Sequence, residues 1–227
     1  FAAVMATPSD LEDLAVGFAV TERLVAAYGE ISAVTVQAVD EGYEARLTIP
    51  AARAAELASR RRAFAARTSC SLCGLESLDL LLAERPQRLG IGPRLTPTAL
   101  LRAMAALPSA ERLNGGAHGA HAAGWIDADG ALAHVRADVG RHNALDKLIG
   151  ALLRGGLDPA AGTICLTSRC SIEMVLKAAS VGVAILAAAS SPTELAVRAA
   201  EAAGIALIAG VKTNAFDVYA CRERLEA

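Results

Sequence analysis

Two cysteines separated by two residues are the clearest candidates for covalent chemistry in this chain. Cys70 and Cys73 are followed by Gly74, which allows a tight turn or the close approach of a substrate. Thiolate chemistry needs a stabilising positive charge, which a helix start or the nearby Arg67 could supply. The motif suits three uses: half of a zinc site, a redox pair, or a persulfide carrier with a helper thiol.

The zinc alternative can be compared with base deaminases, which combine His-x-Glu with Pro-Cys-x-x-Cys. Here Ser69 stands in place of the proline. Ala120 and Ala123 stand two residues after His118 and His121, where glutamate is required. We therefore expect no zinc and favour thiol chemistry. A structural zinc held by the two cysteines and the two histidines stays open as an alternative.

A dense polar segment, DVGRHNALDK, occupies residues 138–147 at a predicted helix start. On such a helix His142 and Asp146 share one face, and Asn143 and Lys147 share the next. Ordinary capping and ion pairing would explain this pattern. Because helix amino termini attract anions, we favour a functional interpretation and take His142 as a candidate binding residue.

Cations and hydroxyl groups also follow three predicted parallel strands. Arg169 follows the first strand, Ser190 the second and Lys212 the third. Ligands of parallel sheets bind beyond the carboxyl ends of the strands, and helix starts there hold phosphates. Two hydroxyl-rich strand ends in succession indicate a nucleotide-like ligand with several phosphates.

The periodicity of the chain predicts the elements that position these groups. A helix is expected to begin at residues 7–10, with Thr7 as its cap and Pro8 as its first residue. Glycine turns and alternating β-branched residues predict two hairpins. The hairpin strands span residues 31–39 and 43–49, then 122–126 and 131–135.

Helices and strands alternate in the remainder of the chain. Helices are predicted from Pro50 to about residue 67, from Thr96-Pro97 onward, and over residues 141–154, 171–180 and 192–203. Strands are predicted over residues 163–167, 183–188 and 205–209. This alternation predicts parallel strands joined by right-handed crossovers, with helices on the faces of the sheet.

Composition excludes some classes of partner. A formal charge of -2 and a pI near 6.1 give no broad positive field, so we expect no nucleic-acid partner. The longest apolar stretch, around residues 181–189, is far below the ~20 residues that span a bilayer, so we expect no membrane anchor. Five cysteines without a secretory leader favour reduced thiols in the cytoplasm.

Together the motifs resemble the formate dehydrogenase accessory sulfurtransferases (FdhD). The likeness covers nearly the whole chain. Its motifs are Thr-Pro-x-Asp leading into Leu-Ala-Val-Gly-Phe, Ser-Cys-x-x-Cys-Gly, Gly-Gly-x-His, DVGRHNALDK, Arg-x-Ser-x-Glu at residues 169–173, Ser-Pro-Thr and the closing Phe-Asp-Val-Tyr. DVGRHNALDK is the most specific of them. The chain departs from the family at Ala137, usually an acid, and at Thr167-Ser168, where Ser-Gly is expected before Arg169.

The resemblance implies a function and a site. Such proteins take sulfur from a cysteine desulfurase as a persulfide. They pass it to the molybdenum cofactor, bis-molybdopterin guanine dinucleotide, before the cofactor enters formate dehydrogenase. Cys70 would carry the sulfur and Cys73 would help. The expected cofactor-binding residues are Phe216, Asp217, Val218, Tyr219, Ala220, Cys221, Arg169, Ser190, Lys212 and His142. We expect GDP to act as a mimic of the cofactor.

The resemblance also implies a fold and an assembly. The expected α/β fold is a cytidine deaminase-like three-layer core with a mixed, largely parallel sheet at residues 68–227. A smaller α+β subdomain would occupy residues 1–67, with the family's first strand expected ahead of Phe1. A cytoplasmic homodimer is expected. Two other functions stay open: a non-catalytic chaperone of the molybdenum cofactor, and a zinc-dependent deaminase-like hydrolase.

Overall fold

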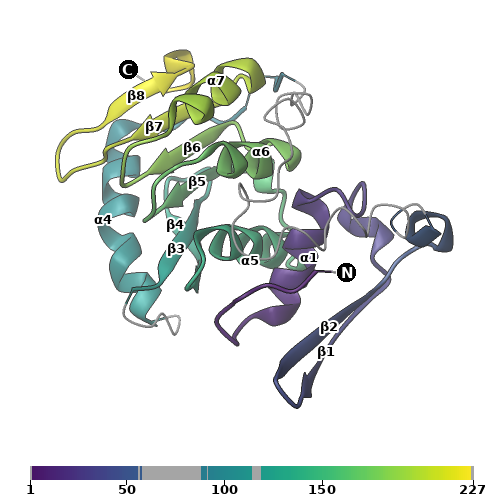
Figure 1. The fold of residues 1–227 in the computed structure, drawn as a ribbon. Coiled ribbons are helices and arrows are strands. Elements are labelled where there is room, and N and C mark those ends of the chain that lie inside the picture. Colours follow the sequence, from purple (N-terminus) through teal and green to yellow (C-terminus); the bar gives the residue numbers. More distant parts are fainter. Residues whose placement is uncertain (1, 56, 58–87, 91, 114–118, 226–227) are drawn as a thin grey trace.

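A six-stranded mixed sheet forms the centre of the computed structural model, which describes residues 2–55, 57, 88–90, 92–113 and 119–225 (Figure 1). The strand order is β4-β3-β5-β6-β7-β8. The strands are β3 (His121–Ile126), β4 (Leu132–Asp138), β5 (Thr163–Leu166), β6 (Ile185–Ala188), β7 (Ala206–Ala209) and β8 (Asp217–Ala220). β6 pairs in parallel with β5 and with β7, and the other neighbours are antiparallel. The sheet is mixed as predicted, but the expectation that it is largely parallel is wrong for the described strands.

Helices cover both faces of this sheet. α4 (Pro97–Leu113) lies on one face, and α5 (Arg141–Arg154), α6 (Ile172–Ser180) and α7 (Glu194–Ala203) lie on the other (Figure 1). Along β5, Cys165 packs in the cluster that includes α4, whereas Ile164 and Leu166 pack with α5 and α6. A strand covered on both faces must be apolar throughout. The expected three layers are therefore present, while the cytidine deaminase-like classification stays a prediction.

The helix α1 (Leu11–Thr21) crosses α5 at very short range. A Cβ built on Gly17 would lie 1.8 Å from the carbonyl oxygen of Asp146. A Cβ on Gly150 would lie 1.9 Å from the carbonyl oxygen of Asp13. Only glycine at both positions lets the two backbones touch.

The domain boundary predicted between residues 67 and 68 lies outside the described residues.

A two-stranded antiparallel hairpin projects from the rest of the chain (Figure 1). Its strands are β1 (Ala33–Val39) and β2 (Gly42–Thr48), so this predicted hairpin is confirmed, as is the one formed by β3 and β4. Residues 51–55 are helical as expected, and the remainder of that predicted helix is not described. Short 3-10 helices occur at η1 (Tyr28–Glu30), η2 (Pro159–Ala161) and η3 (Arg222–Arg224).

The predicted start of the first helix is wrong. α1 begins at Leu11, and Asp10, which precedes it, has a left-handed backbone with φ 50. Thr7 forms long-range hydrogen bonds instead of capping a helix. Its N–H donates to Asp138 Oδ2 at 2.9 Å, and its hydroxyl accepts from the N–H of Val139 at 3.1 Å. These tertiary bonds satisfy the groups that a local cap would have used.

Among the described helices, none combines the length and the apolar character that crossing a membrane requires.

Candidate functional site

One edge of the sheet collects the loops that carry the predicted binding residues. β5, β6 and β7 are mutually parallel, so the loops that follow them leave from the same edge. β3 runs antiparallel to β5, and His121 at its start pairs with Asp138 at the end of β4. The segment that leads into α5 therefore leaves from this edge too. The predicted convergence of strand ends is confirmed.

Hydrogen bonds hold the first two loops side by side. The N–H of Thr193 donates to the carbonyl of Cys170 at 3.0 Å, and the N–H of Ser190 donates to that of Ser168 at 3.4 Å. At the start of β3, the N–H of Ala122 donates to the hydroxyl of Thr167 at 2.8 Å. These bonds fix the positions of the loops that carry the exposed side chains.

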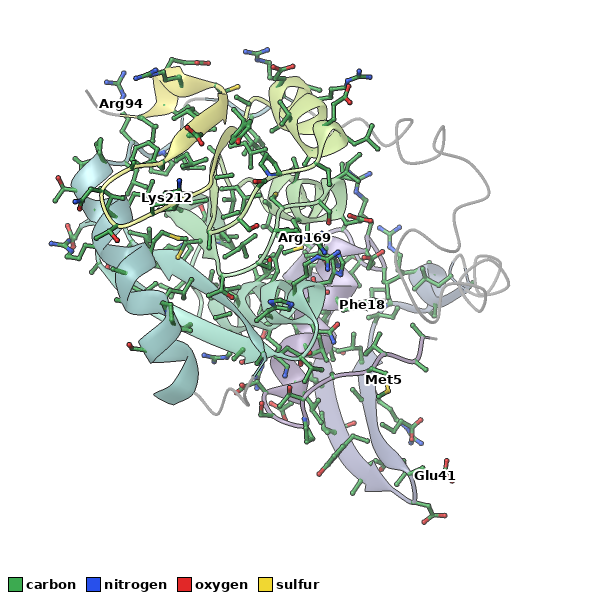
Figure 2. The ribbon with its side chains drawn as sticks, turned by 60° about the vertical axis from the view of Figure 1, so that its left-hand side comes forward. Met5, Phe18, Glu41, Arg94, Arg169 and Lys212 are labelled. Carbon is green, nitrogen blue, oxygen red and sulfur yellow. The ribbon has the colours of Figure 1, made fainter. Side chains whose placement is uncertain are left out.

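Arg169, Ser190 and Lys212 are exposed on three successive loops of this edge, where Figure 2 shows the two cations. His142 is half-buried in the first turn of α5. The side chain of Arg169 makes no hydrogen bond or ion pair with another part of the described chain, so its guanidinium is available to a ligand.

The closing strand does not present all of its predicted residues at this edge. In the antiparallel pairing of β8 with β7, Asp217 lies opposite Ala209 and Ala220 lies opposite Leu207. Phe216 and Asp217 therefore stand near the carboxyl edge, whereas Ala220 and Cys221 stand toward the opposite end of the sheet. Val218 and Tyr219 lie between the two ends. The structure thus places the start of the predicted stretch at the same sheet edge as Arg169, three strands away, and its end elsewhere.

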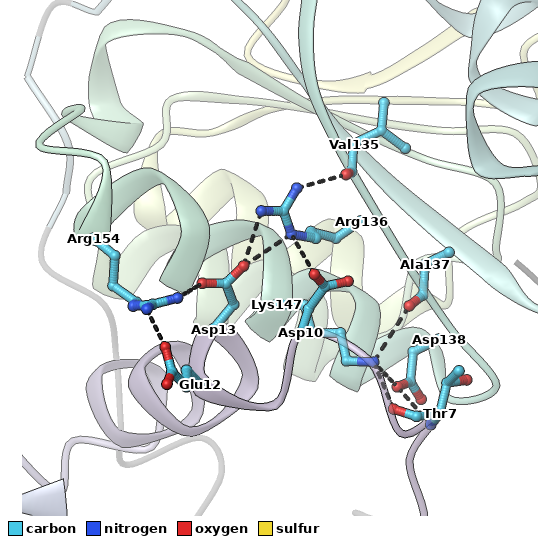
Figure 3. A network of polar contacts seen from close by, with 10 residues as sticks. All are labelled: Thr7, Asp10, Glu12, Asp13, Val135, Arg136, Ala137, Asp138, Lys147 and Arg154. Atoms are coloured by element: carbon cyan, nitrogen blue, oxygen red, sulfur yellow. Dashed lines mark hydrogen bonds and ion pairs between the residues drawn. The ribbon is translucent and has the colours of Figure 1, made fainter. Parts of the chain in front are cut away.

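Three residues of the DVGRHNALDK block, Asp138, Asp146 and Lys147, form buried ion pairs. Lys147 Nζ lies 2.6 Å from Asp138 Oδ2 (Figure 3). Asp146 pairs with Lys177 of α6 at 2.9 Å and accepts from the hydroxyl of Thr21 at 2.7 Å. Burial alone would lower the pKa of Lys177, but Asp146 and then Glu22 raise it. The net shift is upward, so the ammonium stays charged. These pairs have a structural role: Asp146 and Lys177 fasten α1 and α6 to α5, and Lys147 fastens α5 to the end of β4.

Acidic residues at the start of α1 form a second network with two arginines (Figure 3). Asp13 accepts from Arg136 of β4 at 2.9 Å and also from Arg154 at the end of α5. Arg154 pairs with Glu12 as well, and Arg136 lies 3.7 Å from Asp10. This network holds α1 against both β4 and α5.

Four side chains at the starts of α5 and α6 hold buried polar atoms without partners in the described chain. They are Arg141 Nε, His142 Nε2, Ser171 Oγ and both carboxylate oxygens of Glu173. Burial and the charge of Arg141 lower the pKa of His142 to about 4, so its imidazole is neutral near pH 7. In the sequence, Glu173 appeared only as part of the family motif. Its place in the first turn of a helix beside Arg169 was the available signal.

The described thiols are poorly suited to nucleophilic chemistry. Burial raises the pKa of Cys165 to about 12. Burial, followed by the charge of Glu173, raises that of Cys170 to about 12. Burial also raises the pKa of the half-buried Cys221. Cys70 and Cys73, the predicted catalytic pair, lie outside the described residues, as does His118. Within the described chain, no three metal-binding side chains form a cluster.

The described residues form a three-layer α/β protein in which hydroxyls, cations and helix starts meet at one sheet edge, the kind of place where proteins of this class bind phosphates. The sequence then identifies the family: residues 1–226 match the family model of the FdhD/NarQ family, and the chain belongs to that family.

Relatives agree with this assignment, and a solved structure matches the fold. The chain is 42% identical to the sulfur carrier protein FdhD of Bordetella petrii over 224 residues, which cover 99% of this chain and 80% of that protein. It is 43% identical to the sulfur carrier protein FdhD of Xanthomonas campestris pv. campestris over 226 residues, covering 100% and 80%. A crystal structure of a putative formate dehydrogenase accessory protein from Desulfotalea psychrophila matches the fold. Its TM-score is 0.73, with 23% identity, over 98% of this chain and 82% of that one.

Proposed function

We propose that this protein is a sulfurtransferase that carries sulfur on Cys70 and delivers it to the molybdenum cofactor of a formate dehydrogenase. The observation that carries the proposal is a family match over nearly the whole chain, with relatives named sulfur carrier protein FdhD, together with the Cys-x-x-Cys motif. The described thiols support it by elimination, because the pKa values of Cys165 and Cys170 are about 12 and both thiols are therefore protonated.

Sulfur transfer through the two thiols can be written so that it balances. The Cys70 thiolate attacks the outer sulfur of a persulfide on a cysteine desulfurase. A sulfur–sulfur bond forms at Cys70, and the donor cysteine leaves as a thiolate. The Cys73 thiolate then attacks the inner sulfur of the Cys70 persulfide. This step forms a Cys70–Cys73 disulfide and releases sulfide to the metal centre, and an external thiol later reduces the disulfide.

The substrate that receives this sulfur is the bis-molybdopterin guanine dinucleotide form of the cofactor. Its phosphates fit the exposed Arg169, Ser190 and Lys212 at the carboxyl edge, where α6 and α7 begin. His142, at the start of α5, and Phe216 and Asp217, near the same edge, complete the proposed binding residues. The proposed setting is a cytoplasmic homodimer that works between a cysteine desulfurase and formate dehydrogenase.

Desulfurase treatment should place one sulfur on Cys70. Intact-protein mass spectrometry after incubation with a cysteine desulfurase and cysteine should show a gain of ~32 Da that a reducing thiol removes. Cys73→Ala should keep the gain because its carrier thiol is intact, and Cys70→Ala should lose it. Cys221→Ala is the matched control and should behave as the wild type. A persistent gain on Cys70→Ala would assign the carrier to another residue.

GDP should bind at the carboxyl edge through Arg169. Calorimetry should show binding to the wild type. Arg169→Ala should weaken it by roughly 1.5–3 kcal/mol, because one charge-assisted phosphate contact is lost. Arg198→Ala is a suitable control, since this exposed arginine pairs with Glu194 along α7. Equal affinities of the wild type and Arg169→Ala would remove Arg169 from the site.

A further inference from the structure

Unsatisfied polar atoms gather where α5 and α6 begin. Arg141 and His142 lie in the first turn of α5, Ser171 precedes α6, and Glu173 lies in its first turn. Ser171 and Glu173 are only 7% and 9% exposed, yet the Ser171 hydroxyl and both Glu173 oxygens have no partner in the described chain. An unpaired buried carboxylate is among the most unfavourable arrangements in a protein.

Other buried acids nearby are fully paired. Asp138 contacts Lys147 and accepts from three further donors, and Asp146 contacts Lys177. The described part of the fold thus supplies partners to these carboxylates and leaves Glu173 without one. A ligand that donates hydrogen bonds would remove the penalty of burying Glu173, whereas no contact within the described chain does so.

The charges in this cluster do not favour an anion. The positive Arg141 and the negative Glu173 balance each other, and both act electrostatically on His142, which is neutral. The cluster therefore offers two acceptor oxygens on Glu173, with unpaired donors on Arg141 and Ser171 at the same two helix starts. A neutral, planar group that carries donors and an acceptor on one edge matches this set. A phosphate does not, because Glu173 would repel it.

We propose that this cluster binds the amino-oxopyrimidine edge that guanine and pterin share. The Glu173 carboxylate accepts from the ring N–H and from the exocyclic amine, as a pair of parallel charge-assisted bonds. Arg141 or Ser171 donates to the ring carbonyl oxygen. The inference rests on the proposed function, because the dinucleotide substrate contains both ring systems, and it assigns to Glu173 the recognition of one of them.

Exchanging donors and acceptors tests this assignment. Calorimetry compares GDP, IDP, which lacks the exocyclic amine, and XDP, which has a carbonyl in its place. The wild type should bind GDP at least about tenfold more tightly than IDP or XDP, because each analogue loses a bond to the carboxylate. Glu173→Gln should lose this preference and gain affinity for XDP, because the amide N–H donates to the added carbonyl. A misfolded variant cannot gain affinity.

Adding 6-methylpterin as a second probe distinguishes whether the cluster binds guanine or the pterin. If the cluster binds guanine, GDP should outcompete 6-methylpterin and show the preference over IDP. If it binds the pterin, 6-methylpterin should bind the wild type and lose affinity at least about tenfold in Glu173→Gln, while GDP and IDP bind equally. Either pattern supports the assignment of Glu173 and names the ring.

Glu194→Gln is the matched control, because Glu194 is an exposed acid in the first turn of the next helix. It should leave every preference as in the wild type. If the wild type binds neither GDP nor 6-methylpterin, both the proposed cofactor site and this inference are wrong. If Glu173→Gln binds GDP, XDP and 6-methylpterin as the wild type does, only the inference is wrong and the proposed function stands.

Discussion

Replacing Gly150 with alanine should destabilise the protein by at least about 3 kcal/mol and leave little folded chain. The added Cβ would lie 1.9 Å from the carbonyl oxygen of Asp13 and 2.9 Å from the backbone nitrogen of Gly17. Both are backbone atoms of α1 and cannot rotate away. The helices α1 and α5 would therefore have to separate.

Separation of the two helices would disturb more than one contact. Asp13 reaches Arg136 and Arg154 from the same turn of α1 that meets Gly150, so its ion pairs depend on the close approach. Alanine also raises helix propensity, by about 1 kcal/mol over glycine. This gain is smaller than the expected clash, so the net effect is destabilising.

Urea denaturation followed by circular dichroism measures the change. Gly29→Ala is the matched control, because a Cβ at Gly29 meets nothing within 4 Å. That variant should stay within about 0.5 kcal/mol of the wild type. If Gly150→Ala were equally stable, the close crossing of α1 and α5 would be incorrect.

Local sequence patterns predicted the helices and strands better than they predicted the long-range pairing between them. Glycine turns between alternating residues marked both hairpins, and the predicted helix over residues 141–154 has the observed ends. The sheet was misjudged because β3 and β4 join β5 by antiparallel pairing, which no local periodicity reveals. The first helix was placed too early because Thr7 bonds to Asp138, far along the chain.

The candidate site was also predictable only where local sequence patterns sufficed. Arg169, Ser190 and Lys212 could be predicted, because the ends of successive parallel strands must meet at one edge. The sequence could place Glu173 near this edge, in a helix start shortly after Arg169, but it could not single it out as a binding residue. Its importance depends on its burial near the start of α5, which lies about thirty residues earlier in the chain. A sequence does not show which buried acid lacks a partner.

Removal of the Asp138 carboxylate should be nearly as severe as the change at Gly150. Asp138→Ala should lower the free energy of unfolding by about 3–5 kcal/mol, because it leaves the fully buried Lys147 ammonium without its counter-ion. The carboxylate also accepts from the N–H groups of Thr7 and Gly140 and from the amide of Asn143. These donors would lose their partner as well.

A double-mutant cycle, measured by urea denaturation, separates the destabilisation caused by the unpaired Lys147 ammonium from that caused by the lost hydrogen bonds of Asp138. Lys147→Met alone should be less damaging than Asp138→Ala, because Asp138 keeps its other donors. Asp138→Ala combined with Lys147→Met should be more stable than Asp138→Ala alone, because the double variant buries no unpaired charge. Glu194→Ala, which breaks an exposed pair, is the control and should change little. Additive losses in the cycle would mean that Lys147 and Asp138 do not depend on each other, contrary to their 2.6 Å contact.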